Sequence, residues 1–182
     1  MKIPVVACLI GLLPLPLAAA PPARTAQTPP SLCKPSETVV FSCQTGPKTV
    51  SICASADASP TSGTLYYRYG KHESQEKPEL ELPDSATAPS RAALGDSVAF
   101  SGGGGAWLRF SRGQTSYTAY TGIGKWGPRG EVREKAGLVV EQAGKRLATL
   151  SCVNQKALSL LGPDWFEKAG IKSGNVDFEF PD

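Results

Sequence analysis

Basic and aromatic side chains are interleaved in one stretch of the sequence, from Arg109 to Lys135. This stretch holds six basic and two acidic residues, a local balance of +4. Arg, Tyr and Trp dominate the binding hot spots of protein interfaces, and aromatic rings beside glycine-rich loops also suit stacking on sugars. We therefore predict a partner-binding surface over residues 102–107 and 117–129. Its expected contact residues are Tyr117, Thr121, Lys125, Trp126 and Arg129.

The alternative for each of these residues is an ordinary structural role. Tyr117 or Tyr120 could fill the core while the arginines are simply solvated. Lys125 and Trp126 fall in an expected loop, where a tryptophan has less core to enter, so these two residues carry the prediction best.

The sequence offers little for acid-base or nucleophilic catalysis. Its one histidine, His72, lies among charged residues, and the cysteines are expected to be oxidised, so no Ser–His or Cys–His pair is predicted. Five acids within twelve residues could supply the carboxylate pair of a glycosidase, but a general acid needs an apolar setting that raises its pKa. We expect these acids on a solvated loop and edge strand: Glu73, Glu76, Glu79, Glu81 and Asp84. No catalytic residue is predicted.

Two glycine-rich stretches resemble phosphate-binding loops only in composition. Residues 122–127 read Gly-Ile-Gly-Lys-Trp-Gly, but Pro128 follows instead of a helix, so the dinucleotide context is missing. Residues 101–105 read Ser-Gly-Gly-Gly-Gly without the Gly-Lys-Ser/Thr ending of a Walker loop. We predict a glycine-rich turn for the first stretch and a mobile hairpin tip for the second, and no cofactor.

The first nineteen residues have the layout of a secretory signal peptide, with Lys2, an apolar run and a small-residue end that predicts cleavage after Ala19. Residues 20–36 are rich in proline and small polar residues and are expected to form an extended tether. Residues 37–182 are then a single disulfide-bonded β domain. This organisation predicts a periplasmic or secreted protein whose mature chain does not insert into a membrane.

Without Cys8 of the leader, four cysteines remain, an even number that predicts two disulfides in an oxidising compartment. No Cys-x-x-Cys pair occurs, so no metal site is predicted. Of three connectivities, the alternation of the strands favours two pairs, Cys43–Cys152 and Cys33–Cys53.

The pairing follows from a hairpin expected over residues 37–55. If the chain turns at residues 45–48, Gln44 faces Thr49 and Val40 faces Cys53. Cys43 and Cys53 then lie farther apart than the roughly 7 Å between Cα atoms that a disulfide allows. Cys43 and Cys152 both point to the core, which leaves Cys53 for Cys33 on the arriving tether.

Short β-like runs separated by turn residues predict an all-β fold: an antiparallel β-sandwich or small barrel of about 8–10 strands with a short helical C-terminal segment. Two brief helices are expected, at residues 155–161 and at residues 163–169, the second capped by Gly170. The β-like runs from which these strands are expected span residues 37–44, 49–55, 63–69, 79–82, 97–101, 106–111, 115–121, 131–135, 138–142, 145–153 and 176–180.

The leader, tether, cysteine-bearing strands and the run from Leu65 to Gly70 resemble small exported proteobacterial β proteins of unassigned function. The general plan is also similar to periplasmic lysozyme inhibitors and related immunity proteins, which insert a loop into a hydrolase cleft. Residues 117–121 match the start of the Tyr-x-x-x-Thr-Lys-Gly stretch of one inhibitor type, whereas Gly122 and Ile123 replace its Lys-Gly. Ser101-Gly102 likewise matches only the start of the Ser-Gly-x-Tyr loop.

These observations predict a non-catalytic periplasmic binding protein with a protein partner in the cell envelope. The resemblance implies inhibition of a lysozyme or other peptidoglycan hydrolase by loop insertion. A glycan-binding or envelope-maintenance module is the alternative, and an unrecognised carboxylate-dependent hydrolase is the third hypothesis. The net charge of +3 and pI of about 8.6 are too small for a nucleic-acid partner.

Overall fold

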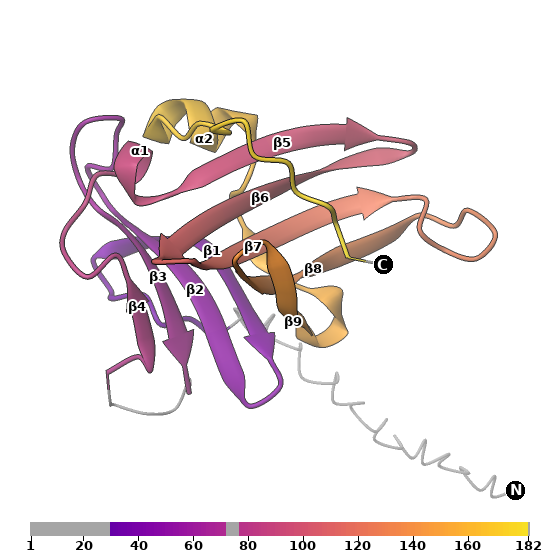
Figure 1. The fold of residues 1–182 in the computed structure, drawn as a ribbon, viewed down its shortest axis with the longest axis horizontal. Helices are drawn as coiled ribbons and strands as arrows, with labels where there is room; N and C mark the ends of the chain where they lie inside the picture. Colours follow the sequence, from indigo (N-terminus) through magenta and orange to yellow (C-terminus); the bar gives the residue numbers. More distant parts are fainter. Residues whose placement is uncertain (1–29, 72–76, 182) are drawn as a thin grey trace, which may run out of the picture.

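The computed structural model describes residues 30–71 and 77–181, which form two antiparallel five-stranded sheets (Figure 1). The first sheet has the order β10-β1-β2-β3-β4 and the second the order β5-β6-β7-β8-β9. The first sheet contains β1 (Glu37–Thr45), β2 (Lys48–Ser55), β3 (Leu65–Gly70), β4 (Leu80–Leu82) and β10 (Leu158–Ser159). The second contains β5 (Leu94–Phe100), β6 (Gly103–Arg112), β7 (Thr115–Gly124), β8 (Arg133–Gln142) and β9 (Lys145–Ser151). The helical segments are α1 (Pro89–Ala92), η1 (Val153–Gln155) and α2 (Pro163–Ala169).

The core lies between the two sheets, where the inward-facing, alternate residues of the strands pack against one another. Phe41 and Ile52 of the first sheet and Leu108 of the second are fully buried. Such alternation is the period-2 pattern of strands with one buried face. The predicted antiparallel sandwich is therefore confirmed, whereas the barrel alternative is not, because the two sheets do not close on each other.

Both predicted disulfides are present. Cys33 is bonded to Cys53 and Cys43 to Cys152, with Cα–Cα distances of 5.3 and 5.5 Å. The second bond joins β1 of one sheet to the end of β9 in the other, so it ties the two layers together. Two disulfides are typical of proteins that fold in an oxidising compartment.

The β1–β2 hairpin has the predicted turn but a different register at its open end. Gln44 faces Thr49 as expected, whereas a bulge between Val39 and Phe41 places Val39, not Val40, opposite Cys53. A bulge inserts one residue on one strand, and alternation alone does not reveal it.

Three other expectations about elements are wrong. The separate strands 131–135 and 138–142 are one continuous strand, β8, because Ala136 and Gly137 pair with β7 like their neighbours. The expected helix 155–161 is instead the end of η1 followed by β10. Residues 176–180 are not a strand, although Val176 and Phe178 alternate in burial with Asp177. The helix over residues 163–169 is confirmed, and Gly170 ends it at a φ of 70°.

A row of polar side chains crosses the outer face of the first sheet, one residue on each of four paired strands. Arg68 in this row is only 2% exposed and is held by two carboxylates. Its guanidinium donates to both oxygens of Glu37, at 2.5 and 2.9 Å, and its Nε donates to Glu81 at 2.6 Å. The row consists of Ser42, Ser51, Arg68 and Glu81.

The N-terminal segment, residues 30–36, covers this row. The Leu32 N–H donates to the Ser51 hydroxyl at 3.0 Å, and the Ser42 hydroxyl donates to the Pro30 carbonyl at 2.7 Å. The disulfide at Cys33 fixes the same segment to β2. These residues of the predicted tether are therefore packed against the sheet.

The C-terminal segment, residues 173–181, covers the outer face of the second sheet. Phe178 and Phe180 pack there on Trp107 of β6 and Tyr120 of β7. The segment crosses the strands without joining their ladder, so its alternating pattern reflects side-chain packing (Figure 1).

Candidate functional site

The strands β5–β8 of the second sheet extend beyond the first sheet, toward the right in Figure 1. The β7–β8 loop, residues 125–132, projects from this extended end. The inner face of the same end borders a groove. The extended end therefore carries the loop and the groove side by side.

The predicted contact residues separate into three places. Tyr117 is half-buried on the inner face of β7, where its ring lies 5.4 Å from that of Tyr67, so it packs against the core. Thr121 lines the groove. The β7–β8 loop holds the remaining three, Lys125, Trp126 and Arg129.

The β7–β8 loop is organised by its own hydrogen bonds. The Gly127 N–H donates to the Glu131 carbonyl at 3.0 Å, and the Gly130 N–H donates to the Gly127 carbonyl at 2.8 Å. The Arg129 N–H donates to the Glu131 carboxylate at 3.1 Å. This backbone N–H, together with that of Glu131 itself, holds the pKa of the Glu131 carboxyl below its usual value. The loop is thus held in one conformation by hydrogen bonds between its own residues.

Trp126 anchors the base of the loop. Its ring centroid lies 5.1 Å from that of Phe100 and 6.4 Å from that of Phe180, and Lys135 Nζ lies 4.8 Å over the ring. These contacts place the indole against the outer face of the sheet. Trp126 therefore positions the loop and leaves its tip to the charged residues.

The loop and the first residue of β8 present cations to solvent. Lys125, Arg129 and Arg133 are exposed, and none of them forms an ion pair with a residue that the structure describes. The Glu131 carboxylate accepts the hydrogen bond from the Arg129 N–H, so its negative charge is partly compensated within the loop. The tip thus offers a rigid backbone carrying a guanidinium at Arg129.

Most glycines of the two glycine-rich stretches lie in strands, whereas residues 125–127 are part of the β7–β8 loop. Gly103–Gly105 belong to β6 and Gly122 and Gly124 to β7, so the predicted hairpin tip is limited to the turn at 101–102. A Cβ at Gly105 would lie 2.6 Å from the Phe180 ring, and one at Gly122 would lie 2.9 Å from the Trp126 ring. The missing side chains therefore let these aromatic rings approach the backbone of the outer face closely.

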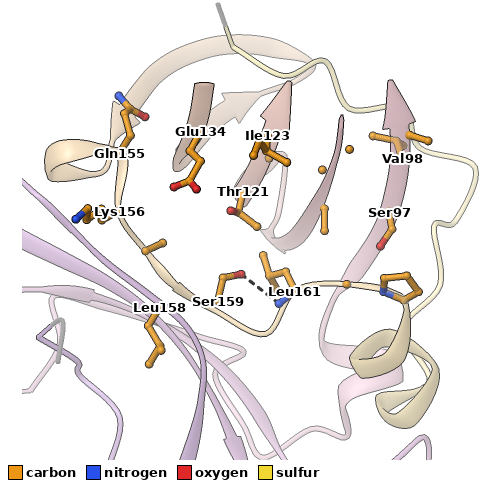
Figure 2. A pocket seen from close by; sticks show the side chains of 18 residues that line it. Ser97, Val98, Thr121, Ile123, Glu134, Gln155, Lys156, Leu158, Ser159 and Leu161 are labelled. Carbon is orange, nitrogen blue, oxygen red and sulfur yellow. Dashed lines mark hydrogen bonds between the residues drawn. The ribbon is translucent and has the colours of Figure 1, made fainter. Parts of the chain in front are cut away.

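The groove has a volume of about 950 Å³ and lies between the inner face of the extended strands and residues 155–163 (Figure 2). Small residues of β6, Gly104 and Ala106, form part of its floor, and Ile123, Leu158 and Leu161 add apolar walls. A groove forms here because the first sheet ends at β10 and leaves this part of the second sheet uncovered.

A few polar groups face the groove. The Glu134 carboxylate points into it in Figure 2 and forms no ion pair with any described residue. The buried Ser97 hydroxyl finds no hydrogen-bond partner in the described part of the chain. The groove was not predicted from the sequence, although small side chains at alternate positions of residues 104–106 are a signal of it.

The acids considered for hydrolysis form ion pairs where they are described. Glu79 contacts Lys48 at 2.6 Å, Glu81 contacts Arg68, and Asp84 contacts Arg112. His72, Glu73 and Glu76 lie outside the described residues. Among the described residues, one group of potential metal ligands lies close together: Cys33, Glu37 and Cys53. The two cysteine sulfurs of this group are bonded to each other in a disulfide.

The described architecture defines a class: a disulfide-bonded antiparallel β-sandwich with a projecting basic loop. The chain matches no family model, no curated protein and no solved structure. In the part that the structure describes, no helix is both long enough and apolar enough to cross a membrane.

Proposed function

We propose that this protein is a non-catalytic, periplasmic or secreted binding protein that inhibits a peptidoglycan hydrolase, such as a lysozyme, with its β7–β8 loop. The carrying observation is the internally hydrogen-bonded loop that presents Arg129 at its tip without an ion-pair partner among the described residues. The predicted signal peptide and the two disulfides support an extracytoplasmic location.

The charge of the tip suits the clefts of glycoside hydrolases. These enzymes commonly carry a pair of carboxylates that flank the scissile bond. A guanidinium inserted between them can form charge-assisted, bidentate hydrogen bonds. Removing one partner of such a buried charge pair costs about 2–5 kcal/mol of binding free energy.

Preorganisation of the loop adds affinity in a second way. A segment that is already held in its bound conformation loses less conformational entropy on binding. The hydrogen bonds at Gly127 and Gly130 and the packing of Trp126 fix both ends of the tip. This rigidity favours insertion into a preformed cleft.

The glycan-binding alternative has less support. The Trp126 ring is engaged by Phe100, Phe180 and Lys135, and the Tyr117 ring packs on Tyr67. A stacking platform for sugars needs an open aromatic face. The aromatic rings of Trp126 and Tyr117, which suggested sugar binding, therefore pack against other side chains of the domain.

The test uses the mature, oxidised protein and a panel of lysozymes of different structural types. Binding is measured by calorimetry and inhibition by hydrolysis of peptidoglycan. We expect stoichiometric inhibition of one type, and Arg129→Ala should weaken binding by about 30-fold or more, as the loss of about 2 kcal/mol implies.

The matched control is Arg91→Ala, which removes an exposed arginine of α1 far from the loop in sequence. This variant should bind like the wild type. The proposal is wrong if no hydrolase of the panel binds, or if both variants lose affinity equally while remaining folded.

A further inference from the structure

The groove borders a free strand edge of the first sheet. Leu158 of β10 pairs with Ser42, and directly after β10 the Leu160 N–H donates to the Val40 carbonyl at 2.7 Å. In an antiparallel strand, the backbone groups of alternate residues point to opposite sides. Those of Ala157 and Ser159 therefore point away from β1, on the side of the groove that both residues line.

These backbone groups have no strand beside them. Of the described strands, β10 pairs only with β1 and forms the edge of its sheet. An exposed edge is a template for pairing with another extended chain. The extended part of β6 and β7 lies over this edge, so an added strand would be covered on one face.

The dimensions and surface of the groove suit such a strand. Besides residues 155–163, the groove is lined by residues of the four neighbouring strands β5, β6, β7 and β8, and strands are spaced about 4.8 Å apart. This gives room for about four or five extended residues at about 3.3 Å each. Gly104, Ala106 and Thr121 on the floor leave space for the side chains on one side of the strand.

Two charged residues line the groove, Glu134 and Lys156, and the one whose charged group points into it in Figure 2, Glu134, defines the complementary residue. Glu134 lines the groove from β8, is exposed, and has no ion-pair partner among the described residues. A lysine or arginine on the incoming strand would pair with this carboxylate. The unpartnered Ser97 hydroxyl on the far side offers a further hydrogen bond.

We propose that the groove binds an extended peptide segment of a partner protein, which joins the first sheet as a sixth strand beside β10. The peptide is apolar on its inward side and carries a basic residue opposite Glu134. This site is distinct from the tip of the β7–β8 loop and does not depend on the proposed inhibition.

The test uses a panel of dye-labelled, capped heptapeptides that alternate valine and threonine, with one lysine placed at each position in turn. Fluorescence anisotropy measures their binding to the mature, oxidised protein. We expect saturable binding of at least one peptide, at least fivefold weaker binding when its lysine becomes glutamate, and slowed hydrogen exchange at Ala157 and Ser159.

N-methylated peptides test strand addition directly. Methyl groups are placed on alternate amides in either of the two frames. Only one edge of the peptide can pair with β10, so methylation in one frame should abolish binding and methylation in the other should preserve it. Equal binding of the two methylated peptides would contradict strand addition.

Three variants probe the groove from the protein side. Glu134→Gln should weaken binding of the lysine peptide at least fivefold, whereas the control Glu179→Gln, on the exposed side of the C-terminal segment, should not. Ser159→Pro removes an N–H that faces away from β1, and Thr121→Trp fills the floor; each should lower affinity at least tenfold. A cooperative urea unfolding transition like that of the wild type establishes that a variant is folded.

Several results would overturn the proposal. The first is failure of the whole panel to bind, and the second is binding that Thr121→Trp and Glu134→Gln leave unchanged. A concentration-dependent dimer that Thr121→Trp dissociates would identify a second copy of the chain as the occupant. Arg129→Ala should leave peptide binding unchanged. Failure of peptide binding in the groove can therefore be distinguished from failure of hydrolase inhibition by the β7–β8 loop.

Discussion

The ring of Phe180 lies nearly parallel to that of Trp126, with an interplanar angle of 25° and 6.4 Å between the centroids. This contact joins the C-terminal segment to the base of the β7–β8 loop. Phe180 also contacts Phe100, Tyr120 and Phe178. The end of the chain therefore helps to position the residues that we propose bind a partner.

Phe180→Ala should loosen the loop without unfolding the domain. The substitution removes an aromatic neighbour of Trp126, while the core between the sheets stays intact. Because Phe180 is only partly buried, the loss of stability should stay below the roughly 3–5 kcal/mol of a fully buried phenylalanine. The indole N–H resonance of Trp126 should shift in Phe180→Ala and stay in place in the control Leu147→Ala, which alters a side chain exposed by 57%.

Arg68→Ala should be among the most destabilising substitutions outside the apolar core. It leaves Glu37 largely buried without its guanidinium partner, which costs about 3–5 kcal/mol of unfolding free energy. Arg112→Ala breaks the exposed pair with Asp84 and should cost less than about 1 kcal/mol. Urea unfolding of both variants compares the two, and equal losses would contradict the structural role of Arg68.

Acid should weaken the attachment of the N-terminal segment. Burial opposes ionisation of Glu37, but hydrogen bonds from Arg68 and the Lys34 N–H, with the charge of Arg68, lower its pKa below the ordinary 4.5. A lowered carboxyl pKa adds stability above the unfolded-state value, and this stability is lost as pH falls through the folded-state value. The unfolding free energy should therefore decline below about pH 4.5, and Glu37→Gln should reduce that decline.

Tyr67→Phe should leave stability unchanged or raise it slightly. The Tyr67 hydroxyl is buried, has no hydrogen-bond partner among the described residues, and burial strongly raises its pKa. Removing a buried polar group that has no partner avoids its desolvation cost. Tyr120→Phe, which removes a hydrogen bond with Ser151, should instead cost about 0.5–1.5 kcal/mol by thermal or urea unfolding.

The two disulfides should contribute unequally. They join residues 20 and 109 positions apart, so in the loop-entropy model their removal costs about 3 and about 5 kcal/mol, respectively. Double replacement of Cys33 and Cys53 by alanine should therefore leave a folded domain, and replacement of Cys43 and Cys152 should destabilise it more. The urea midpoints of the two double variants show which disulfide contributes more stability, and mass spectrometry verifies that the remaining disulfide has formed.

Local patterns were enough for much of the fold. Alternating residues at 37–44 and 49–55 predicted the first hairpin, and its register excluded a Cys43–Cys53 bond. Gly170 marked the end of α2 because a left-handed residue is most easily a glycine. The charged loop residues Lys125 and Arg129 were also recognised, since basic residues within a glycine-rich segment usually remain exposed.

Other features depended on contacts between distant segments. Residues 176–180 alternate like a strand, yet they pack as side chains on Trp107 and Tyr120. Trp126 reads as a binding residue, but its ring is covered by Phe100 and Phe180. Neither partner is near Trp126 in the sequence, so no local pattern could reveal these contacts.

The sequence by itself determined the all-β class, the two disulfide pairs and the charged loop, because strand alternation and turn residues act over a few neighbours. Only the tertiary structure decided where the first sheet ends relative to the second. That offset creates the groove beside Ser159 and Glu134 from residues of five strands and a connecting segment. A groove of this kind is a property of how layers are placed on one another, and this placement is set by the packing of the whole core.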